Sequence, residues 1–123
     1  MALPAKSVLD LFRHAQDGVA FAEGQTIFKQ GDHGDQMYVV QDGEVELRVR
    51  DHVVALVGPG GILGEMALID DQLRSATAVA KTSCSLISID QRRFQYLVQQ
   101  TPYFALQVMR VMAERLRRMD EQL

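Results

Sequence analysis

Residues 64–77 read Gly-Glu-Met-Ala-Leu-Ile-Asp-Asp-Gln-Leu-Arg-Ser-Ala-Thr, a stretch that combines a carboxylate, a cation and small residues. Glu65 can only accept hydrogen bonds when it is ionised, so it suits a sugar hydroxyl. Arg74 presents a fixed fork of donors that matches phosphate oxygens. Gly64 lets a ligand approach the backbone closely, and residues 66–69 can form one helical turn whose first N–H groups attract an anion. The stretch therefore predicts a turn that binds a phosphate and a sugar hydroxyl together.

On both sides of this stretch, from Val19 to Ile89, apolar residues follow a period of two. Val45, Leu47 and Val49 alternate with charged residues, which is typical of a strand with one buried face and one face in water. Glycine and aspartate occur between such segments and supply turns that permit positive φ. These turn signals are Asp17-Gly18, Glu23-Gly24, Gly31 to Gly34, Asp42-Gly43 and Gly58 to Gly61. Many short strands joined in this way predict a barrel or a sandwich.

Helical patterns flank the strands. A short amphipathic helix is expected over residues 7–14, with Ser7 as its N-cap. Asp90 is the expected N-cap of a second helix, because apolar residues recur after it at helical spacing. Pro102 ends that helix and opens a third, since proline cannot continue a helix but is well suited to its first position.

The last helix carries apolar residues in a heptad pattern. They are Ala105, Met109, Met112, Leu116, Met119 and Leu123. The stripe either covers the chain's own barrel or forms a coiled-coil contact in a homodimer. Methionine adapts to either environment, so the pattern does not choose between the two.

Gly64 to Leu68, followed by Arg74 to Thr77, resembles the phosphate-binding cassette of cyclic nucleotide-binding domains. This family includes domains of the regulatory subunit of cAMP-dependent protein kinase, of the bacterial catabolite activator protein and of nucleotide-gated channels. Residues 30–40 and 42–45 resemble the family's glycine-punctuated strands, and the likeness extends from about Leu9 to the end of the chain.

The resemblance implies an α+β fold, with one domain over residues 1–123. Its centre is an antiparallel β-roll, a jelly-roll-like barrel, over about residues 17–89. A short N-terminal helix, a cassette helix and two C-terminal helices, over about 90–100 and 102–123, complete the expected fold.

The resemblance also implies a role for each cassette residue. Arg74 would hold the equatorial phosphate oxygen, Ser75 would add its N–H and hydroxyl, and Glu65 would accept from the ribose 2′-OH. Gly64 and Met66 would offer backbone N–H groups. The expected apolar wall near the ribose and base is Leu47, Val49 and Leu63, with the small Ala67 leaving room for the ligand. Three residues of the last helix, Met112, Arg115 and Leu116, are the candidates for capping the base.

The expected ligand is cAMP, with cGMP left open. In the family, cGMP-selective members resemble one another in carrying threonine directly after the cassette arginine, where a hydroxyl can reach the guanine amino group. Ser75 also places a hydroxyl there, but the catabolite activator protein, which responds to cAMP, looks the same at this position. Ser75 is therefore compatible with both nucleotides.

A regulatory sensor is expected, not an enzyme. The sequence shows no nucleophile paired with a base, and His14, His33 and His52 lack the spacing of metal ligands. No cofactor and no metal are expected. Two alternatives remain: a nucleotide-independent dimerisation or interaction module, and a ligand-binding fragment of a larger Crp-type transcription regulator or channel. At the level of single residues, Glu65 and Arg74 could also be a structural ion pair.

The composition fits one ordinary globular domain, with 123 residues, 47% of them hydrophobic, and a formal net charge of −3. That charge provides no general attraction for nucleic acid. Five arginines near the C-terminus are expected on a solvated face: Arg92, Arg93, Arg115, Arg117 and Arg118. Cys84 is the only cysteine and is expected to be a buried structural thiol. The sequence has no long apolar run and no signal-peptide pattern at residues 1–6, so a cytoplasmic location is expected.

Overall fold

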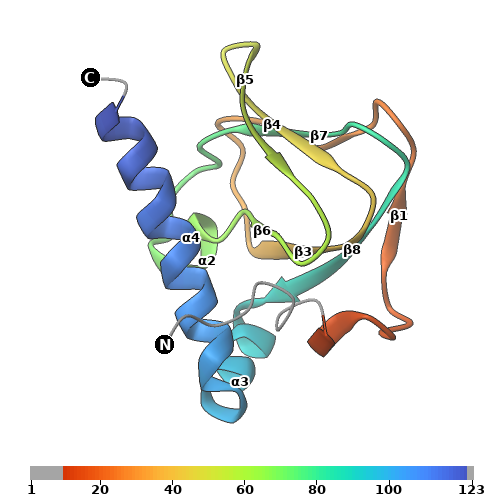
Figure 1. Cartoon of the computed structure of the whole chain (residues 1–123), viewed down its shortest axis with the longest axis vertical. Coiled ribbons are helices and arrows are strands. Elements are labelled where there is room, and N and C mark those ends of the chain that lie inside the picture. The colour runs from red at the N-terminus through yellow and green to blue at the C-terminus, as the bar shows by residue number, and fades with distance from the viewer. Residues whose placement is uncertain (1–9, 122–123) are drawn as a thin grey trace.

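Two four-stranded antiparallel sheets form a β-roll in the computed structural model, which describes residues 10–121 (Figure 1). The first sheet contains, in spatial order, β1 (Val19–Phe21), β8 (Cys84–Asp90), β3 (Gln36–Asp42) and β6 (Ile62–Leu63). The second contains β2 (Thr26–Phe28), β7 (Thr77–Ala80), β4 (Val45–Val49) and β5 (His52–Val57). The predicted antiparallel β-roll is therefore confirmed.

The side chains of β3 and β8 give the first sheet two apolar faces. One face lines the interior of the roll, with Val40 and Leu86 fully buried in it. The other face packs against the helices, with Val39 and Ile87 fully buried there. Because successive side chains of a strand point to opposite faces, these two strands serve two separate cores, one inside the roll and one between the roll and the helices.

The hairpin between β4 and β5 uses a turn that carries no glycine. Arg50 and Asp51 both adopt positive φ, at 51° and 68°, and Val49 pairs directly with His52. Positive φ at two successive residues is the backbone of the two-residue hairpin turn that matches strand twist. The sequence at Arg50-Asp51 contains no glycine, and this turn was not among those predicted.

Three helices follow the boundaries expected from local signals. They are α2 (Met66–Ile69), α3 (Gln91–Gln100) and α4 (Pro102–Glu121). Asp90 caps α3, because its side chain accepts a hydrogen bond from the backbone N–H of Arg93 at 2.8 Å. Residues 10–12 are helical, whereas the expected N-cap Ser7 lies outside the described residues. No helix in the described part of the chain has the length and apolarity needed to cross a membrane.

The buried face of α4 is offset from the heptad stripe. Phe104 and Val108 are buried against the roll, and Val111 packs beside them. Met109 and Leu116 belong to the stripe, yet they are 61% and 62% exposed. These two residues therefore do not cover the barrel. The residues of α4 that do cover it, such as Phe104 and Val108, lie one position earlier, about 100° around the helix.

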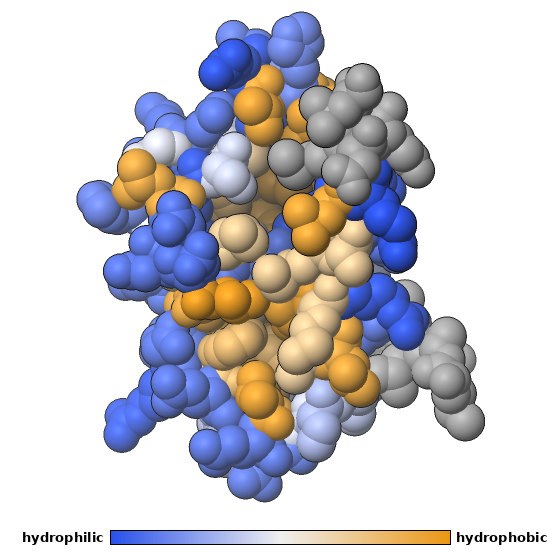
Figure 2. All heavy atoms as spheres, turned by 90° about the vertical axis from the view of Figure 1, so that its left-hand side faces the viewer, coloured by the Kyte–Doolittle hydropathy of each residue, from blue (hydrophilic) through white to orange (hydrophobic). Residues whose placement is uncertain are grey.

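Figure 2 faces the side of the molecule on which α4 lies and shows apolar side chains gathered along the middle of that face. Leu106, Met109 and Leu116 are the exposed large apolar residues of α4. Two other stripe residues, Ala105 and Met112, are half-buried, and Met112 packs against the core between the roll and the helices. The side chains of Met119 and Leu123 lie outside the described part. The coiled-coil contact stays a prediction.

Other expectations from composition have mixed outcomes. Cys84 is buried, as predicted, and burial raises the pKa of its thiol, which makes it unreactive.

Arg93, expected on a solvated face, instead donates to Asp17 at 2.7 Å and lies over the ring of Phe12. The hydrogen bond from Arg93 lowers the pKa of Asp17. Arg93 thus fastens the segment from Phe12 to Asp17 to α3.

Candidate functional site

The turn between β6 and α2 places Glu65 at the start of the cassette. Gly64 has a φ of +78°, which only glycine adopts without strain, and a Cβ there would lie 2.5 Å from Nη1 of Arg74. Glu65 follows directly, and its carbonyl accepts from the N–H groups of Leu68 and Ile69 at 3.1 Å. The one-turn helix predicted for residues 66–69 is α2 itself. Gly64 therefore provides both the backbone reversal and the space for the arginine.

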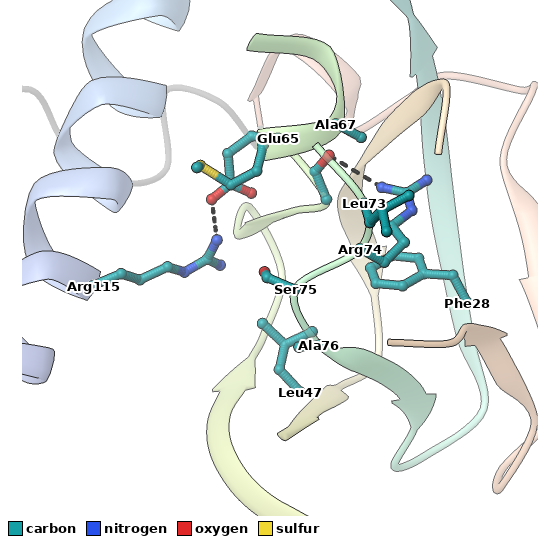
Figure 3. A pocket seen from close by; sticks show the side chains of 11 residues that line it. Phe28, Leu47, Glu65, Ala67, Leu73, Arg74, Ser75, Ala76 and Arg115 are labelled. Carbon is teal, nitrogen blue, oxygen red and sulfur yellow. Dashed lines mark hydrogen bonds and ion pairs between the residues drawn. The ribbon is translucent and has the colours of Figure 1, made fainter. Parts of the chain in front are cut away.

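Arg74 is held in a tight enclosure and is only 7% exposed. Its guanidinium carbon lies 4.2 Å from the centre of the Phe28 ring, and Nη1 donates to the carbonyl of Gly64 at 3.1 Å (Figure 3). A Cβ at Gly34 would overlap with the guanidinium. Burial lowers the pKa of Arg74, while Tyr38 and the nearby carboxylates act in the opposite direction. An arginine keeps its charge through such shifts.

The loop before β3 also forms backbone hydrogen bonds with Arg74. The N–H of Arg74 donates to the carbonyl of Asp32 at 2.8 Å, and the N–H of Gly31 donates to the carbonyl of Arg74 at 2.8 Å. Gly34, interpreted from sequence only as a turn former, therefore also makes room for the cation of the cassette, and Gly31 helps to hold its backbone.

Glu65 pairs with Arg115 of α4, not with Arg74. The carboxylate is 1% exposed, and its Oε1 accepts from Nη1 of Arg115 (Figure 3). Nη2 of Arg115 also donates to the carbonyl of Ile62 at 2.8 Å. The alternative of a structural Glu65–Arg74 ion pair is therefore wrong. The solvated face expected for Arg115 is wrong as well, because this side chain bridges α4 to the turn.

Two buried polar atoms of the cassette have no hydrogen-bond partner among the described residues. They are Oε2 of Glu65 and Nε of Arg74. Leaving a buried donor or acceptor unsatisfied costs about 1–3 kcal/mol, so proteins rarely keep such atoms without a use. One atom accepts and the other donates, and their side chains carry opposite charges. The pair suits a ligand that has both a hydroxyl donor and an anionic acceptor.

A small cavity brings most of the predicted site residues together. It is lined by Phe28, Leu47, Gly64, Glu65, Met66, Ala67, Leu73, Arg74, Ser75, Ala76 and Arg115. Its volume is about 30 Å³, whereas ligand pockets usually have about 300–1,000 Å³. A nucleotide would therefore have to move part of this lining.

Seven of the nine predicted site residues line the cavity, and two do not. Leu63 is fully buried inside the roll, opposite Tyr38, and Val49 lies at the far end of β4 beside the hairpin turn. Phe28, Leu73 and Ala76 also line the cavity but were not predicted from the sequence. Leu73 and Ala76 flank Arg74 and Ser75, so adjacency could have indicated them. Phe28 lies on another strand and had no local signal.

The cyclic nucleotide-binding domain profile matches residues 19–101. The chain belongs to the cyclic nucleotide-binding domain family. The cyclic AMP receptor protein of Thermus thermophilus is 37% identical over 109 residues, which cover 84% of this chain and 50% of that protein. The cAMP-dependent protein kinase regulatory subunit of Eremothecium gossypii is 40% identical over 77 residues, 63% of this chain and 17% of that protein. The domain thus spans half the length of these curated relatives, or less.

Solved structures agree with this assignment. The crystal structure of the Thermus thermophilus catabolite activator protein matches the domain with a TM-score of 0.79 at 32% identity, over 94% of this chain and 57% of that one. A protein from a cyclic-GMP-dependent signalling pathway that regulates bacterial phytopathogenesis matches with a TM-score of 0.73 at 30% identity, over 96% and 95% of the two chains. The resemblance read from the cassette and the fold that it implied are both confirmed.

Proposed function

We propose that the domain binds cAMP and acts as a regulatory sensor, not as an enzyme. The observation that carries this proposal is the pair of buried, unpartnered atoms, Oε2 of Glu65 and Nε of Arg74, beside one cavity. A ribose 2′-OH would donate to Glu65, and a cyclic phosphate would accept from Arg74 and Ser75. Gly64 and Met66 would add backbone N–H groups. A buried arginine and a phosphate form a strong charge-assisted contact.

The relatives support cAMP and keep cGMP as the second candidate. Two of the relatives described above are named for cAMP, whereas one of the solved structures comes from a cyclic-GMP-dependent signalling pathway. The cGMP-dependent protein kinase of Plasmodium berghei is also 38% identical over 91 residues, 66% of this chain and 11% of that protein. The proposal includes a cytoplasmic location, which the free thiol of Cys84 suits because reducing compartments keep thiols unpaired.

Calorimetric titration of the chain with cAMP and with cGMP tests the proposed ligand. We expect cAMP to bind more tightly and to raise the midpoint of thermal unfolding, because a ligand at about 100 times its Kd stabilises the folded state by about 2.7 kcal/mol. Adenosine, which lacks the phosphate, is the control and should bind far more weakly. Failure of both cyclic nucleotides to bind would overturn the function. A cGMP preference that is lost in Ser75→Ala would reverse the choice of base.

Movement of the C-terminal helices is the second part of the proposal. The cavity is too small for a nucleotide, and one of its walls is Arg115 of α4. Binding would shift the lining, and a shift of Arg115 would make the position of α4 sensitive to the ligand. Residues 100–102 join α3 to α4 and would serve as the hinge.

Hydrogen exchange tests this movement. We expect cAMP to slow amide exchange over residues 103–121, because the ligand would favour the state in which α4 closes on the site. The strands of the roll are the internal reference, since their protection should change less than that of α4. Deleting α4 is a poorer test, because Phe104 and Val108 are part of the core. Unchanged exchange in α4, with cAMP bound, would show that α4 is a fixed packing element.

A homodimer through α4 is the second candidate function. The exposed Leu106, Met109 and Leu116 favour it, since large apolar side chains seldom gather on a free surface without a partner. This role needs no nucleotide. Light scattering with and without cAMP distinguishes a dimer that depends on the ligand from one that does not.

A further inference from the structure

The aromatic ring of Phe28 lies against the buried cation of the cassette. The guanidinium carbon of Arg74 is 4.2 Å from the centre of this ring, and Figure 3 shows the two groups next to each other. Gly34 also lies close to the guanidinium, because a Cβ there would be 2.3 Å from Cζ of Arg74. An uncharged ring and uncharged backbone therefore confine the cation.

Phe28 is supported in turn by Tyr38, which belongs to the other sheet. The two rings are stacked, with centroids 6.1 Å apart and planes inclined by 22°. Phe28 ends β2, an edge strand whose register with β7 is irregular at this point. Tyr38 lies on β3 and is paired on both sides, with Leu63 of β6 and Ser88 of β8. The stack therefore links Phe28, and with it the cation, to the middle of the first sheet.

An aromatic ring is well suited to hold an arginine that has to bind an anion. The negative face of the ring attracts the cation, and this attraction is larger where water is excluded. A carboxylate in the same place would also stabilise the cation, but it would accept its N–H groups and would repel a phosphate. Nη1 of Arg74 donates to the carbonyl of Gly64, whereas Nε has no partner among the described residues. Phe28 can therefore stabilise the charge and leave Nε available to a phosphate.

We propose that Phe28, supported by Tyr38, is a positioning residue for phosphate binding, because its ring holds the guanidinium of Arg74 in place before the ligand arrives. This inference rests on the proposed function and adds to it a residue that makes no hydrogen bond to the ligand. Without the ring, the long side chain of Arg74 would have to be ordered when the ligand binds, and that ordering costs binding free energy.

The test is the affinity of Phe28→Leu for cAMP, measured by calorimetric titration. We expect the affinity to fall roughly 3- to 10-fold, because leucine fills much of the space but does not hold the guanidinium. The matched control is Phe21→Leu, since Phe21 is also partly buried against the core inside the roll. The affinity of this control should stay within about twofold of the wild type, as expected for a site that does not touch the cation.

A phenylalanine whose ring carries three fluorine atoms, placed at position 28, keeps the test decisive even if Phe28→Leu alters the packing of the roll. Fluorine withdraws electron density from the ring face and changes the shape of the ring little, so it weakens the attraction to the cation. We expect the affinity for cAMP to fall by at least about twofold. An affinity equal to that of the wild type would show that Phe28 is only an apolar wall, and would overturn the proposal.

The NMR signal of the Nε–H group of Arg74 tests the arrangement without a ligand. Arg74→Ala identifies the signal, because it is absent from the spectrum of that variant. The ring current of Phe28 should shift this signal in the wild type, and most of the shift should be lost in Phe28→Leu. An unchanged signal would overturn the positioning role. A wild-type chain that shows the shift but binds no cyclic nucleotide would instead overturn the proposed function.

Discussion

Replacing Arg74 with alanine is expected to weaken cAMP binding by about 2–4 kcal/mol, measured by calorimetric titration. The side chain is buried, and Phe28 and the carbonyl of Gly64 fix the position of its guanidinium. The substitution removes a desolvated, charge-assisted contact to phosphate. The loss should therefore exceed that of any other single change in the cassette.

Two controls separate this effect from a general loss of structure. Arg48→Ala makes the same substitution on the outer face of β4, where Arg48 contacts Glu46, and should leave the affinity unchanged. Glu65→Gln should cost less than Arg74→Ala, because an amide oxygen still accepts from the ribose hydroxyl. Equal affinity of the wild type and Arg74→Ala would contradict the assignment of the cassette.

Replacing Phe104 with alanine is expected to lower the free energy of unfolding by about 3–5 kcal/mol, measured by chemical denaturation. The ring is fully buried and meets the rings of Phe12 and Phe94 edge to face, with centroid distances of 6.5 Å and 5.9 Å. The substitution leaves a cavity where α4 and α3 meet the helical residues 10–12.

Tyr96→Ala is the matched control for Phe104, since Tyr96 is an aromatic residue on α3 with most of its surface exposed. Its effect should stay within about 0.5 kcal/mol, as is usual for surface positions. A similarly small change for Phe104→Ala would show that the core between the helices and the roll adds little to stability.

Local signals in the sequence predicted much of the fold. The cap at Asp90 and the proline at Pro102 set the starts of α3 and α4, because both act through the backbone of their immediate neighbours. The alternation of Val45 and Leu47 with charged residues predicted β4 for the same reason. Seven cassette and wall residues could be assigned because their spacing resembles a known family.

The site contacts and the buried face of α4 depend instead on contacts between segments far apart in the chain. Nothing beside Arg115 in the sequence indicates that it would reach Glu65, because that contact depends on how α4 crosses the roll. Phe28 meets Arg74 only after β2 and the cassette come together. The heptad stripe did not determine which face of α4 is buried, because Met112 packs against the core whereas Met109 and Leu116 are exposed.

The pairing of β1 with β8 has a consequence for how the chain acquires its structure. These are the first and last strands of the roll, yet Val19 lies opposite Leu86 at the edge of the first sheet. The chain must lose conformational entropy to bring these distant segments together before their hydrogen bonds and packing can stabilise the pairing, and this slows folding. During synthesis β1 has to wait, unpaired, until almost the whole roll has left the ribosome. The roll is therefore expected to form late and in one cooperative step.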